Sequence, residues 1–306
     1  MTKHLTKMSD LTKPDILKIL DLADSMKSDQ KQGKATQPLK GKTLAMIFQK
    51  ASTRTRVSFE TGMYQLGGQA LFLSSSDLQM GRGEPIEDTA RVLGRYVDGI
   101  MIRTFAQKDV EDLAKYSGIP VINGLTDYDH PCQILADLMT IREHKGKLEG
   151  LKLTYIGDGN NVCNSLVVGS LTVGMKVSVA VPKGHEPHQD VLDFAKNHGS
   201  NFELLEDPAT ATKNADVVVT DVWASMGQEE ETAARKKIFA NYQISDALMA
   251  NANPDAIVLH CLPAHRGEEI TAEIMDKHAN VIFDEAENRL HAQKAVMALL
   301  MGSDKF

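Results

Sequence analysis

Short apolar runs alternate with longer amphipathic stretches along most of this chain. Runs rich in Val, Ile and Leu are typical of buried strands, and apolar residues at every third or fourth position are typical of helices. The alternation predicts an α/β fold built from βα units around mostly parallel sheets. The expected strands are residues 43–48, 70–73, 99–102 and 120–123 in the first half, and residues 152–156, 176–181, 202–204, 216–220, 257–260 and 281–284 in the second.

The length of the chain and one polar segment predict two domains. A single hydrophobic core rarely organises more than about 250–300 residues, and this chain has 306. A helical pattern at residues 132–143 leads into the polar segment 144–150. We therefore expect a first domain at residues 1–145 and a second at residues 150–286, each with a mostly parallel sheet flanked by helices. The pattern alone does not say which domain carries the last helix.

Composition excludes several classes of protein. The formal net charge of −7 argues against a general nucleic-acid or membrane-surface binder. Cys132, Cys163 and Cys261 are too widely spaced for a disulfide framework or a CxxC metal pair, which suits a reducing compartment. The first ten residues have no apolar signal core, and no run of about 18 apolar residues occurs. We expect a cytoplasmic protein without membrane or nucleic-acid partners.

A hydroxyl-rich segment with two arginines follows the first expected strand. Residues 51–60 read Ala-Ser-Thr-Arg-Thr-Arg-Val-Ser-Phe-Glu and precede a helical pattern. At a helix start, unpaired backbone N–H groups and the positive end of the helix dipole favour an anion. Arg54 adds a planar guanidinium suited to bidentate oxyanion contacts. Taken by itself, this segment fits equally well an ordinary Ser/Thr helix cap with solvated arginines.

Polar clusters follow other expected strands as well. They are Arg103, residues 127–133, residues 157–161, residues 221–228 and residues 260–261. In open α/β sheets, ligands bind outside the carboxyl ends of the strands. Because such clusters occur in both halves, the sequence predicts a ligand cleft between two domains.

Four of these segments resemble one protein family. They are Ser-Thr-Arg-Thr-Arg-Val-Ser-Phe-Glu at 52–60, His-Pro-Cys-Gln at 130–133, Asp-Val-Trp-Ala-Ser-Met-Gly at 221–227 and His-Cys-Leu-Pro at 260–263. In this order and spacing they resemble the aspartate/ornithine carbamoyltransferase family, and most closely its ornithine branch. The resemblance implies transfer of a carbamoyl group from carbamoyl phosphate to the side-chain amine of L-ornithine, giving L-citrulline and phosphate, without a cofactor or a metal. It also implies that the last helix, residues 287–306, packs back on the first domain.

The resemblance further assigns residues to the two substrates and to an oligomer. The expected carbamoyl phosphate ligands are Ser52, Thr53, Arg54, Thr55, Gln79, Arg103, His130, Gln133, Cys261, Leu262 and Arg289. The expected ornithine ligands are Asn161, Asp221, Ser225 and Met226, and the expected catalytic residues are Arg54, Arg103, His130, Gln133 and Cys261. Gln79 matches a position that reaches into a neighbouring subunit's site, which implies a homo-oligomer, a trimer or a multiple of trimers. A cis Leu262–Pro263 peptide is also implied.

The chemistry of such a transfer can be derived from the residue types. Attack of an amine on the carbamoyl carbon builds negative charge on the carbonyl oxygen and then on the departing phosphate, and fixed donors such as Arg54, Arg103 and His130 stabilise that charge. An alkyl amine with a free pKa of roughly 10.4 must first lose a proton. Since a carboxylate alone would raise that pKa, Asp221 is assigned to binding, and the proton acceptor stays open. Gly227 is expected to give a substrate-covering loop its hinge.

Other interpretations fit the residues less well, among them aspartate carbamoyltransferase, because the Ser-Met-Gly segment at 225–227 and the cysteines at 132 and 261 resemble the ornithine branch. Residues 157–162 resemble a dinucleotide-binding turn, but Val162 replaces its last glycine and no ribose-binding acid ends the next strand. A non-catalytic module on the same fold would not need all five of Arg54, Arg103, His130, Asp221 and Cys261. Putrescine carbamoyltransferase is the closest rival within the family. Asp221 with Ser225 and Met226 favours an amino-acid substrate over putrescine.

Overall fold

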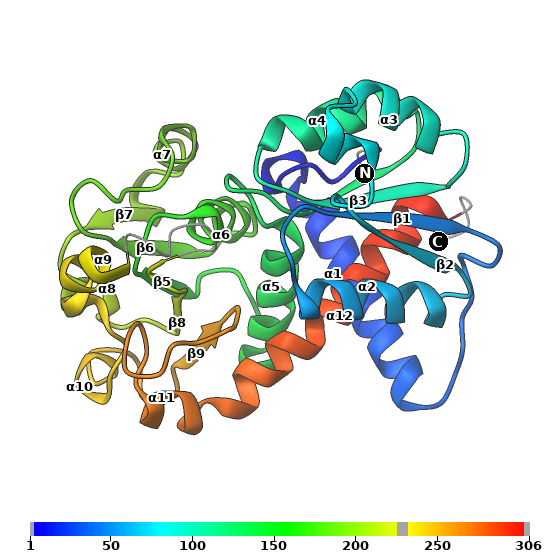
Figure 1. Ribbon diagram of the computed structural model, residues 1–306. Helices are drawn as coiled ribbons and strands as arrows, with labels where there is room; N and C mark the ends of the chain where they lie inside the picture. The colour runs from blue at the N-terminus through cyan, green and yellow to red at the C-terminus, as the bar shows by residue number, and fades with distance from the viewer. Residues whose placement is uncertain (1–2, 225–231, 303–306) are drawn as a thin grey trace. The chain divides into compact units, whose positions relative to one another are not determined.

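The computed structural model describes residues 3–224 and 232–302 of the chain. It divides into two compact units (Figure 1). Unit 1 comprises residues 1–139 together with 288–306, and unit 2 comprises residues 140–287. Each unit contains a parallel sheet flanked by helices, so the predicted α/β class is confirmed.

The sheet of unit 1 has the strand order β2-β1-β3-β4, and every neighbouring pair is parallel. Its strands are β1 (Thr43–Phe48), β2 (Gln69–Ser74), β3 (Gly99–Arg103) and β4 (Val121–Leu125). Side chains alternate between the two faces of a strand, so Ala45 and Ile47 on β1 enter one apolar cluster with residues of α3 and α4. Figure 1 shows these two helices on one face of the sheet and α2 on the other.

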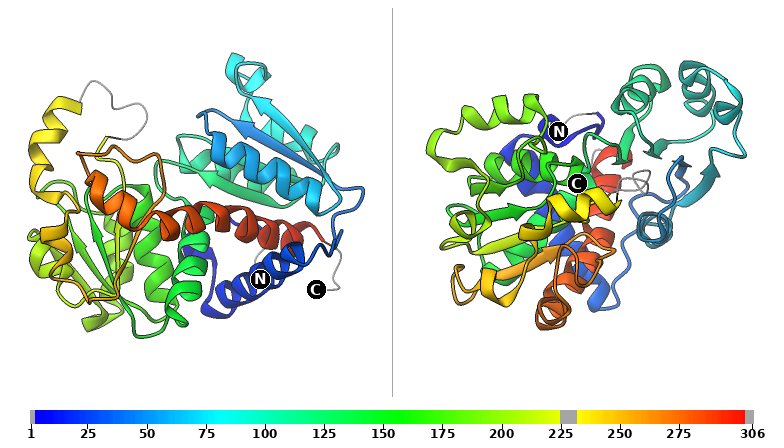
Figure 2. Two further views of the ribbon diagram at one scale, coloured as in Figure 1. Left: turned by 90° about the horizontal axis from the view of Figure 1, so that it is seen from below. Right: turned by 60° about the vertical axis from the view of Figure 1, so that its left-hand side comes forward.

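The helices of unit 1 connect and cover these strands. They are α1 (Lys13–Lys31), α2 (Thr53–Gln65), α3 (Ile86–Leu93), α4 (Gln107–Ser117) and the beginning of α5 (Pro131–Lys145), with short 3-10 turns at Met8–Asp10 and Gln79–Arg82. The second half of α12 (Ala279–Met301) also belongs to unit 1. It lies beside α1 in the views of Figures 1 and 2, and Lys27 Nζ donates a 2.8 Å hydrogen bond to Asn288 Oδ1 between the two helices.

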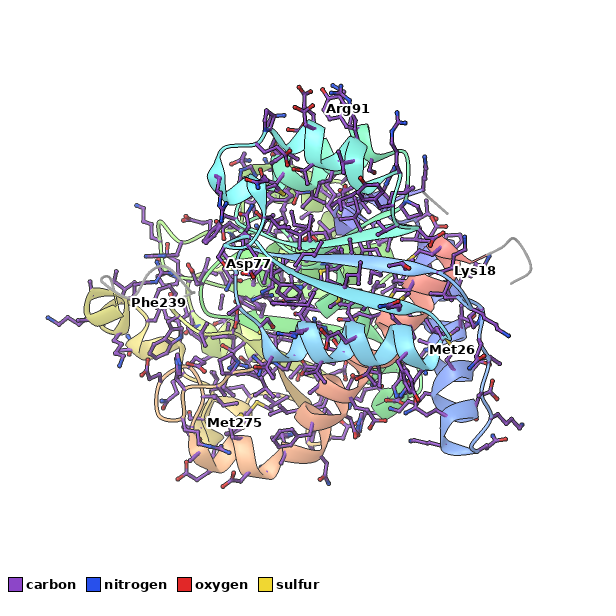
Figure 3. The ribbon with its side chains drawn as sticks, turned by 45° about the vertical axis from the view of Figure 1, so that its right-hand side comes forward. Lys18, Met26, Asp77, Arg91, Phe239 and Met275 are labelled. Atoms are coloured by element: carbon purple, nitrogen blue, oxygen red, sulfur yellow. The ribbon has the colours of Figure 1, made fainter. Side chains whose placement is uncertain are left out.

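The sheet of unit 2 has the order β7-β6-β5-β8-β9 and is again parallel throughout. Its strands are β5 (Lys152–Ile156), β6 (Lys176–Ala180), β7 (Phe202–Leu205), β8 (Val217–Thr220) and β9 (Ile257–His260). The accompanying helices are α6 (Asn161–Thr172), α7 (Gln189–Lys196), α8 (Pro208–Thr212), α9 (Thr232–Ile238), α10 (Asp246–Met249) and α11 (Ala272–Lys277). Phe239, labelled in Figure 3, and Met275 belong to a buried apolar cluster of this unit.

One predicted strand is wrong. Residues 281–284 lie inside helix α12, so the sheet of unit 2 contains five strands among the described residues and not the expected six. A short apolar run cannot be distinguished from a piece of buried helix by its periodicity. The run continues without a turn residue into Glu285 and Asn288, both buried, and Ile282 packs into the core of unit 2.

Two further features bear on the predictions. The Leu262–Pro263 peptide is cis, as expected, and Leu262 has a positive φ of 55°. Within residues 3–224 and 232–302, no helix is both long enough and apolar enough to cross a bilayer.

Candidate active site

In each sheet, the chain passes from the first strand to one side and later returns to form a strand on the other side. In unit 1, β2 lies on one side of β1 and β3 on the other; in unit 2, β6 and β8 flank β5 in the same way. In open α/β sheets, the loops leaving such a pair of strands at their carboxyl ends form a ligand-binding crevice. The loops after β1, β3, β5 and β8 carry Ser52 to Thr55, Thr104, Asn160 with Asn161, and Asp221, and Arg103 is the last residue of β3. Most of the predicted polar clusters therefore lie where the strand order of each sheet predicts a ligand-binding crevice.

The hydroxyl-rich segment starts helix α2, as expected. Ser52 has extended backbone angles, and its side chain accepts a 3.2 Å hydrogen bond from Thr55 N–H. This cap uses one of the N–H groups of the first turn, which leaves the dipole and the preceding amides directed at the space before the helix. Thr55 is buried, Arg54 is half-buried and Arg56 is exposed. Helix cap and anion site are thus compatible at one segment.

Arg289 organises the predicted ligands of unit 1. Its Nη1 donates to Gln133 Oε1 at 2.7 Å, its Nη2 to Thr55 Oγ1 at 3.2 Å, and its Nε to Gln293 Oε1 at 3.0 Å. Gln133 in turn donates from Nε2 to Asp137 Oδ1 at 2.8 Å. One buried guanidinium on α12 therefore joins the first turn of α2 to the first turn of α5.

His130 lies between β4 and α5 and is buried. Burial, followed by the positive charges of Arg289, Arg103 and Arg54, lowers the pKa of His130 well below its ordinary value of 6.5. The imidazole is therefore neutral at physiological pH. The charges of all three arginines thus act on His130. A neutral imidazole has one N–H group, which can donate a hydrogen bond to an oxyanion.

Gln79 stands apart from this group. It is exposed and begins the 3-10 turn Gln79–Arg82. In the part of the chain that the structure describes, no side-chain hydrogen bond joins it to Thr55, Gln133 or Arg289. Its expected role in a neighbouring subunit's site stays a prediction.

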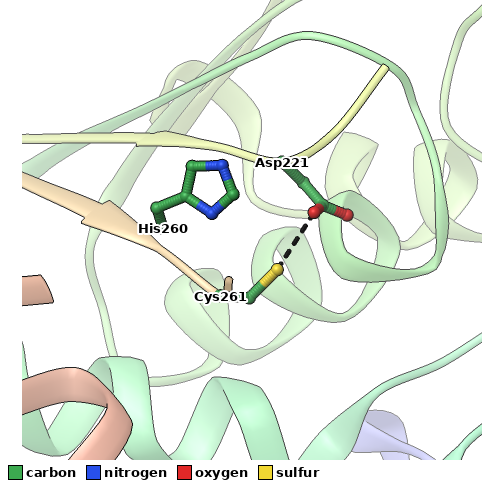
Figure 4. A group of neighbouring side chains, drawn as sticks. All are labelled: Asp221, His260 and Cys261. Atoms are coloured by element: carbon green, nitrogen blue, oxygen red, sulfur yellow. Dashed lines mark hydrogen bonds between the residues drawn. The ribbon is translucent and has the colours of Figure 1, made fainter. Parts of the chain in front are cut away.

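In unit 2, Asp221 is held at both carboxylate oxygens. Asn160 Nδ2 donates to Oδ2 at 2.7 Å, while the Cys261 thiol, 3.0 Å away, and Val222 N–H, 2.8 Å away, donate to Oδ1. Figure 4 shows the contact between Cys261 and Asp221 at the ends of β9 and β8. Asn160 also caps helix α6, because its Oδ1 accepts from the N–H groups of Val162 and Cys163. The carboxylate is thus fixed in orientation before any ligand arrives.

The turn that carries Cys261 and Leu262 depends on a buried histidine. His260 Nδ1 accepts from Leu262 N–H at 2.9 Å, so the ring carries its proton on Nε2, which lies 2.9 Å from Glu269 Oε1. The backbone N–H of His260 donates to Glu285 Oε2 at 2.8 Å. All three side chains are at most 1% exposed. The His-Cys-Leu-Pro segment is therefore anchored through His260, which is hydrogen-bonded to the buried carboxylates of Glu269 and Glu285.

Comparison with known proteins assigns the parts of the chain that carry these two groups of residues to two domains of one family. Residues 3–143 match the family model for the carbamoyl-P binding domain of aspartate/ornithine carbamoyltransferase, and residues 149–300 match the model for its Asp/Orn binding domain. The chain belongs to the aspartate/ornithine carbamoyltransferase family. As predicted, it is therefore an enzyme of the carbamoyltransferase class.

Individual relatives of this family resemble the chain over almost its whole length. The ornithine carbamoyltransferase of Carboxydothermus hydrogenoformans is 60% identical over 304 residues, covering 98% of each chain. That of Thermococcus kodakarensis is 58% identical over 302 residues, covering 97% of this chain and 96% of its own. The solved structure of the Pyrococcus furiosus ornithine carbamoyltransferase has a TM-score of 0.95 at 56% identity, covering 99% of this chain and 98% of that one.

Several residues of this family member were not identified by sequence reasoning. Asn160 contacts Asp221, whereas the predicted Asn161 accepts from Val162 N–H at 3.0 Å. The signal for Asn160 was its place directly before an apolar helix, which is typical of an N-cap. Glu269 and Glu285 carried no comparable signal, because their role depends on meeting His260 in space.

Two predicted ligands and one predicted hinge cannot be placed. Ser225, Met226 and Gly227 lie outside the described residues. Arg235, which follows these residues in the sequence, donates from Nε to the carbonyl of Trp223, which precedes them. Arg235 also forms a close ion pair with Asp158. Burial, opposed by the charge of Arg235, raises the pKa of Asp158. The buried Arg235 therefore links described residues that lie before and after residues 225–231 in the sequence.

Metal-ligating side chains gather at two places within the described residues: Asp221, His260 and Cys261 form one group, and His265, Glu268 and Glu269 form the other. In the first group both ring nitrogens of His260 already have protein partners. In the second, Glu268 is paired with Lys236 at 2.8 Å and Glu269 accepts from His260. Each cluster is thus accounted for by contacts within the protein.

Proposed function

We propose that this enzyme transfers the carbamoyl group of carbamoyl phosphate to the side-chain amine of L-ornithine, releasing L-citrulline and phosphate. The observation that carries the proposal is the group in unit 1, which combines a capped helix start with a neutral, buried histidine on which the charges of three arginines act. The names of the relatives at 58–60% identity support ornithine as the acceptor.

Carbamoyl phosphate is bound by unit 1 in this proposal. Its phosphate is held by the first turn of α2, through Ser52 to Thr55, and by the Arg54 and Arg103 guanidiniums. Its carbonyl oxygen accepts hydrogen bonds from the neutral His130 and from the neighbouring donors. As the amine attacks, negative charge grows first on that oxygen and then on the phosphate. Preorganised donors of this kind are each worth about 2.7–4 kcal/mol of transition-state stabilisation.

Unit 2 supplies the ligands for the amino acid. Asp221 is preoriented by Asn160 and Cys261 and binds an ammonium group of ornithine. Asn161, Ser225 and Met226 complete the amino-acid site by the family resemblance, and Cys261 with Leu262 contributes to the carbamoyl group. The attacking amine must be neutral, so the observed rate is expected to rise between pH 6 and pH 9, below the free amine pKa of roughly 10.4. A flat profile would contradict direct attack by this amine.

We further propose a cytoplasmic homotrimer, or a multiple of trimers. The proposal rests on the exposed Gln79, assigned to a neighbouring subunit's site by the family resemblance. The three free cysteines are compatible with a reducing compartment. Mixing inactive Gln79→Ala and Arg54→Ala chains tests the shared site, because only mixed trimers can assemble an intact one. Absence of regained activity on mixing would refute the sharing.

Arg54→Ala tests the proposed function most directly. It removes a fixed donor from the anion site, so kcat/KM for citrulline formation is expected to fall at least about 100-fold. Arg56→Ala is the matched control, because Arg56 is exposed and pairs with Glu60 at 3.1 Å. The control is expected to stay within about threefold of the parent enzyme. Retained activity in Arg54→Ala would mean that the anion site lies elsewhere.

The choice of acceptor needs a separate assay. Citrulline formation from ornithine is compared with carbamoylputrescine formation from putrescine at equal carbamoyl phosphate. Asp221 together with Ser225 and Met226 is proposed to address the α-amino and α-carboxylate groups of an amino acid. Because putrescine lacks the α-carboxylate, ornithine is expected to be strongly preferred. A preference for putrescine would overturn the substrate assignment and leave the carbamoyltransferase class intact.

A further inference from the structure

We propose that a pocket of unit 1, distinct from the candidate active site, binds a small monocarboxylate with an apolar body through the ammonium group of Lys294. This site, the Lys294 pocket, has a cavity volume of about 590 Å³. It is bounded by the end of α1 and the loop after it, the end of α2, and α12. The lining residues used below are Met26, Gln30, Tyr64, Gln65 and Lys294.

Lys294 is a buried charge with neutral partners. Its side chain is on a residue only 5% exposed, and its Nζ donates to Gln30 Oε1 at 3.0 Å and to Gln65 Oε1 at 2.9 Å. In the described part of the chain these two amide oxygens are its hydrogen-bond partners. An ammonium has three N–H donors, and buried charges in proteins are normally paired with an opposite charge. A carboxylate in the pocket would supply both the third acceptor and the missing charge.

The electrostatic balance around Lys294 points the same way. Burial lowers the pKa of Lys294, and the nearby carboxylate of Asp29 opposes that effect without cancelling it. Burial thus outweighs the favourable charge of Asp29 at this ammonium. The pocket is also lined by Asp29 and Lys34, whose opposite charges offset each other, so a single negative charge is balanced by Lys294 better than the two charges of a phosphate or a dicarboxylate.

The walls of the pocket define the rest of the ligand. Met26, labelled in Figure 3 on α1, is buried and apolar, and Tyr64, which also lines the pocket, is 80% exposed. A thioether and an aromatic face bind a small apolar body, aliphatic or aromatic. A volume near 590 Å³ falls in the usual range of about 300–1,000 Å³ for small-molecule sites. The combination of one charge and an apolar wall fits a compact monocarboxylate.

The Lys294 pocket is separate from the candidate anion site although it shares two helices with it. Gln65 is the last residue of α2 and Ser52 caps its start, so 13 helical residues, or about 20 Å, lie between the two sites. On α12 the spacing is shorter, because Lys294 lies five residues after Arg289, or about 7.5 Å along the helix axis. The hydrogen bonds of Lys294 go to Gln30 and Gln65, whereas those of Arg289 go to Gln133, Thr55 and Gln293, so the two side chains have different partners.

Equilibrium dialysis of the full chain with radiolabelled benzoate tests the proposal. The parent enzyme is expected to bind benzoate saturably, with competition by butyrate and not by inorganic phosphate. Lys294→Met keeps the aliphatic stem beside Gly62 and removes the charge, and it is expected to weaken binding at least about tenfold. Lys18→Met, an exposed lysine of α1 outside the pocket, is the matched control and is expected to bind as the parent does.

Two further variants make the outcome decisive. Arg54→Ala is expected to bind benzoate unchanged, which separates the pocket from the proposed substrate site. Tyr64→Ala, at an exposed position, is expected to weaken binding about threefold or more and serves if Lys294→Met fails to fold. Absence of saturable binding, phosphate competition, binding lost in Arg54→Ala, or equal affinity in the parent and in both pocket variants would overturn the proposal.

Discussion

Arg289 Nη1 donates a 2.7 Å hydrogen bond to Gln133 Oε1, and both side chains are buried. The bond fixes the orientation of the Gln133 amide, because its nitrogen must then face Asp137, to which it donates at 2.8 Å. The same guanidinium reaches Thr55 and Gln293. The last helix of the chain thereby sets the geometry of two candidate ligands that come from different helices.

Replacement of Arg289 by lysine is expected to break this arrangement. A single ammonium cannot serve the acceptors on Gln133, Thr55 and Gln293 together, so the free energy of unfolding should fall by roughly 1–3 kcal/mol. Urea denaturation measures the loss. Arg266→Lys is the control, since Arg266 is exposed and pairs with Asp276 at 3.2 Å, and it should change the value by less than about 0.5 kcal/mol. Equal effects of the two substitutions would contradict the organising role of Arg289.

Glu269 is expected to stabilise the protein through an acceptor oxygen. Its Oε1 is the partner of His260 Nε2 at 2.9 Å and of His265 N–H at 2.6 Å. Glu269→Gln keeps an oxygen at that position, whereas Glu269→Ala leaves a buried imidazole N–H without an acceptor. Alanine should therefore cost roughly 1–3 kcal/mol of unfolding free energy and glutamine clearly less. Should both variants lose the same amount in urea titrations, the negative charge and not the acceptor would be the stabilising feature.

His130 is expected to make folding stability depend on pH on the acidic side. The pKa of His130 is lowered in the folded state by burial and by Arg289, Arg103 and Arg54, while the unfolded chain titrates near 6.5. Below pH 6.5 the unfolded state binds more protons, so this contribution is complete above pH 6.5 and is lost as the pH falls toward the folded pKa. The slope approaches about 1.36 kcal/mol per pH unit for one proton.

A comparison of the parent with His130→Asn isolates this effect. Between pH 6.5 and pH 5.5 the unfolding free energy of the parent should drop by about 1 kcal/mol more than that of the variant. His4 and His278, whose pKa values are also lowered by burial, are present in both proteins and cancel in the difference. Parallel pH profiles would show that the pKa of His130 is not lowered in the folded state.

Cys261 is expected to be the cysteine that reacts in the native protein. Burial raises the pKa of Cys132 to about 12 and raises that of Cys163 well above its ordinary value, whereas Cys261 is partly exposed. The thiolate is the reactive species, so iodoacetamide should modify Cys261 first, and the other two only after unfolding. Peptide mapping by mass spectrometry identifies the site, with Cys261→Ser as the unlabelled control. Early modification of Cys132 or Cys163 would contradict their burial.

Local sequence patterns were enough to predict most of the elements. The strands around residues 43–48 and 152–156 are short apolar runs bounded by polar residues, and both occur as β1 and β5. The run at residues 281–284 looked similar but forms part of α12, because an apolar run of this length carries no periodicity that distinguishes strand from helix. Its state is decided by the core of unit 2, in which Ile282 is buried.

The α/β class and the hydroxyl-rich helix start at Ser52 could be predicted from the sequence, because they depend on residues that are neighbours along the chain. The contacts between distant side chains required the folded structure. Asn160 and Asp221 are 61 positions apart, and Gln133 and Arg289 are 156 positions apart, yet each pair is hydrogen-bonded. Such partners follow from strand order and helix packing, which arise from the burial of apolar faces across the whole unit. The local pattern of apolar and polar residues does not indicate which distant residues become partners.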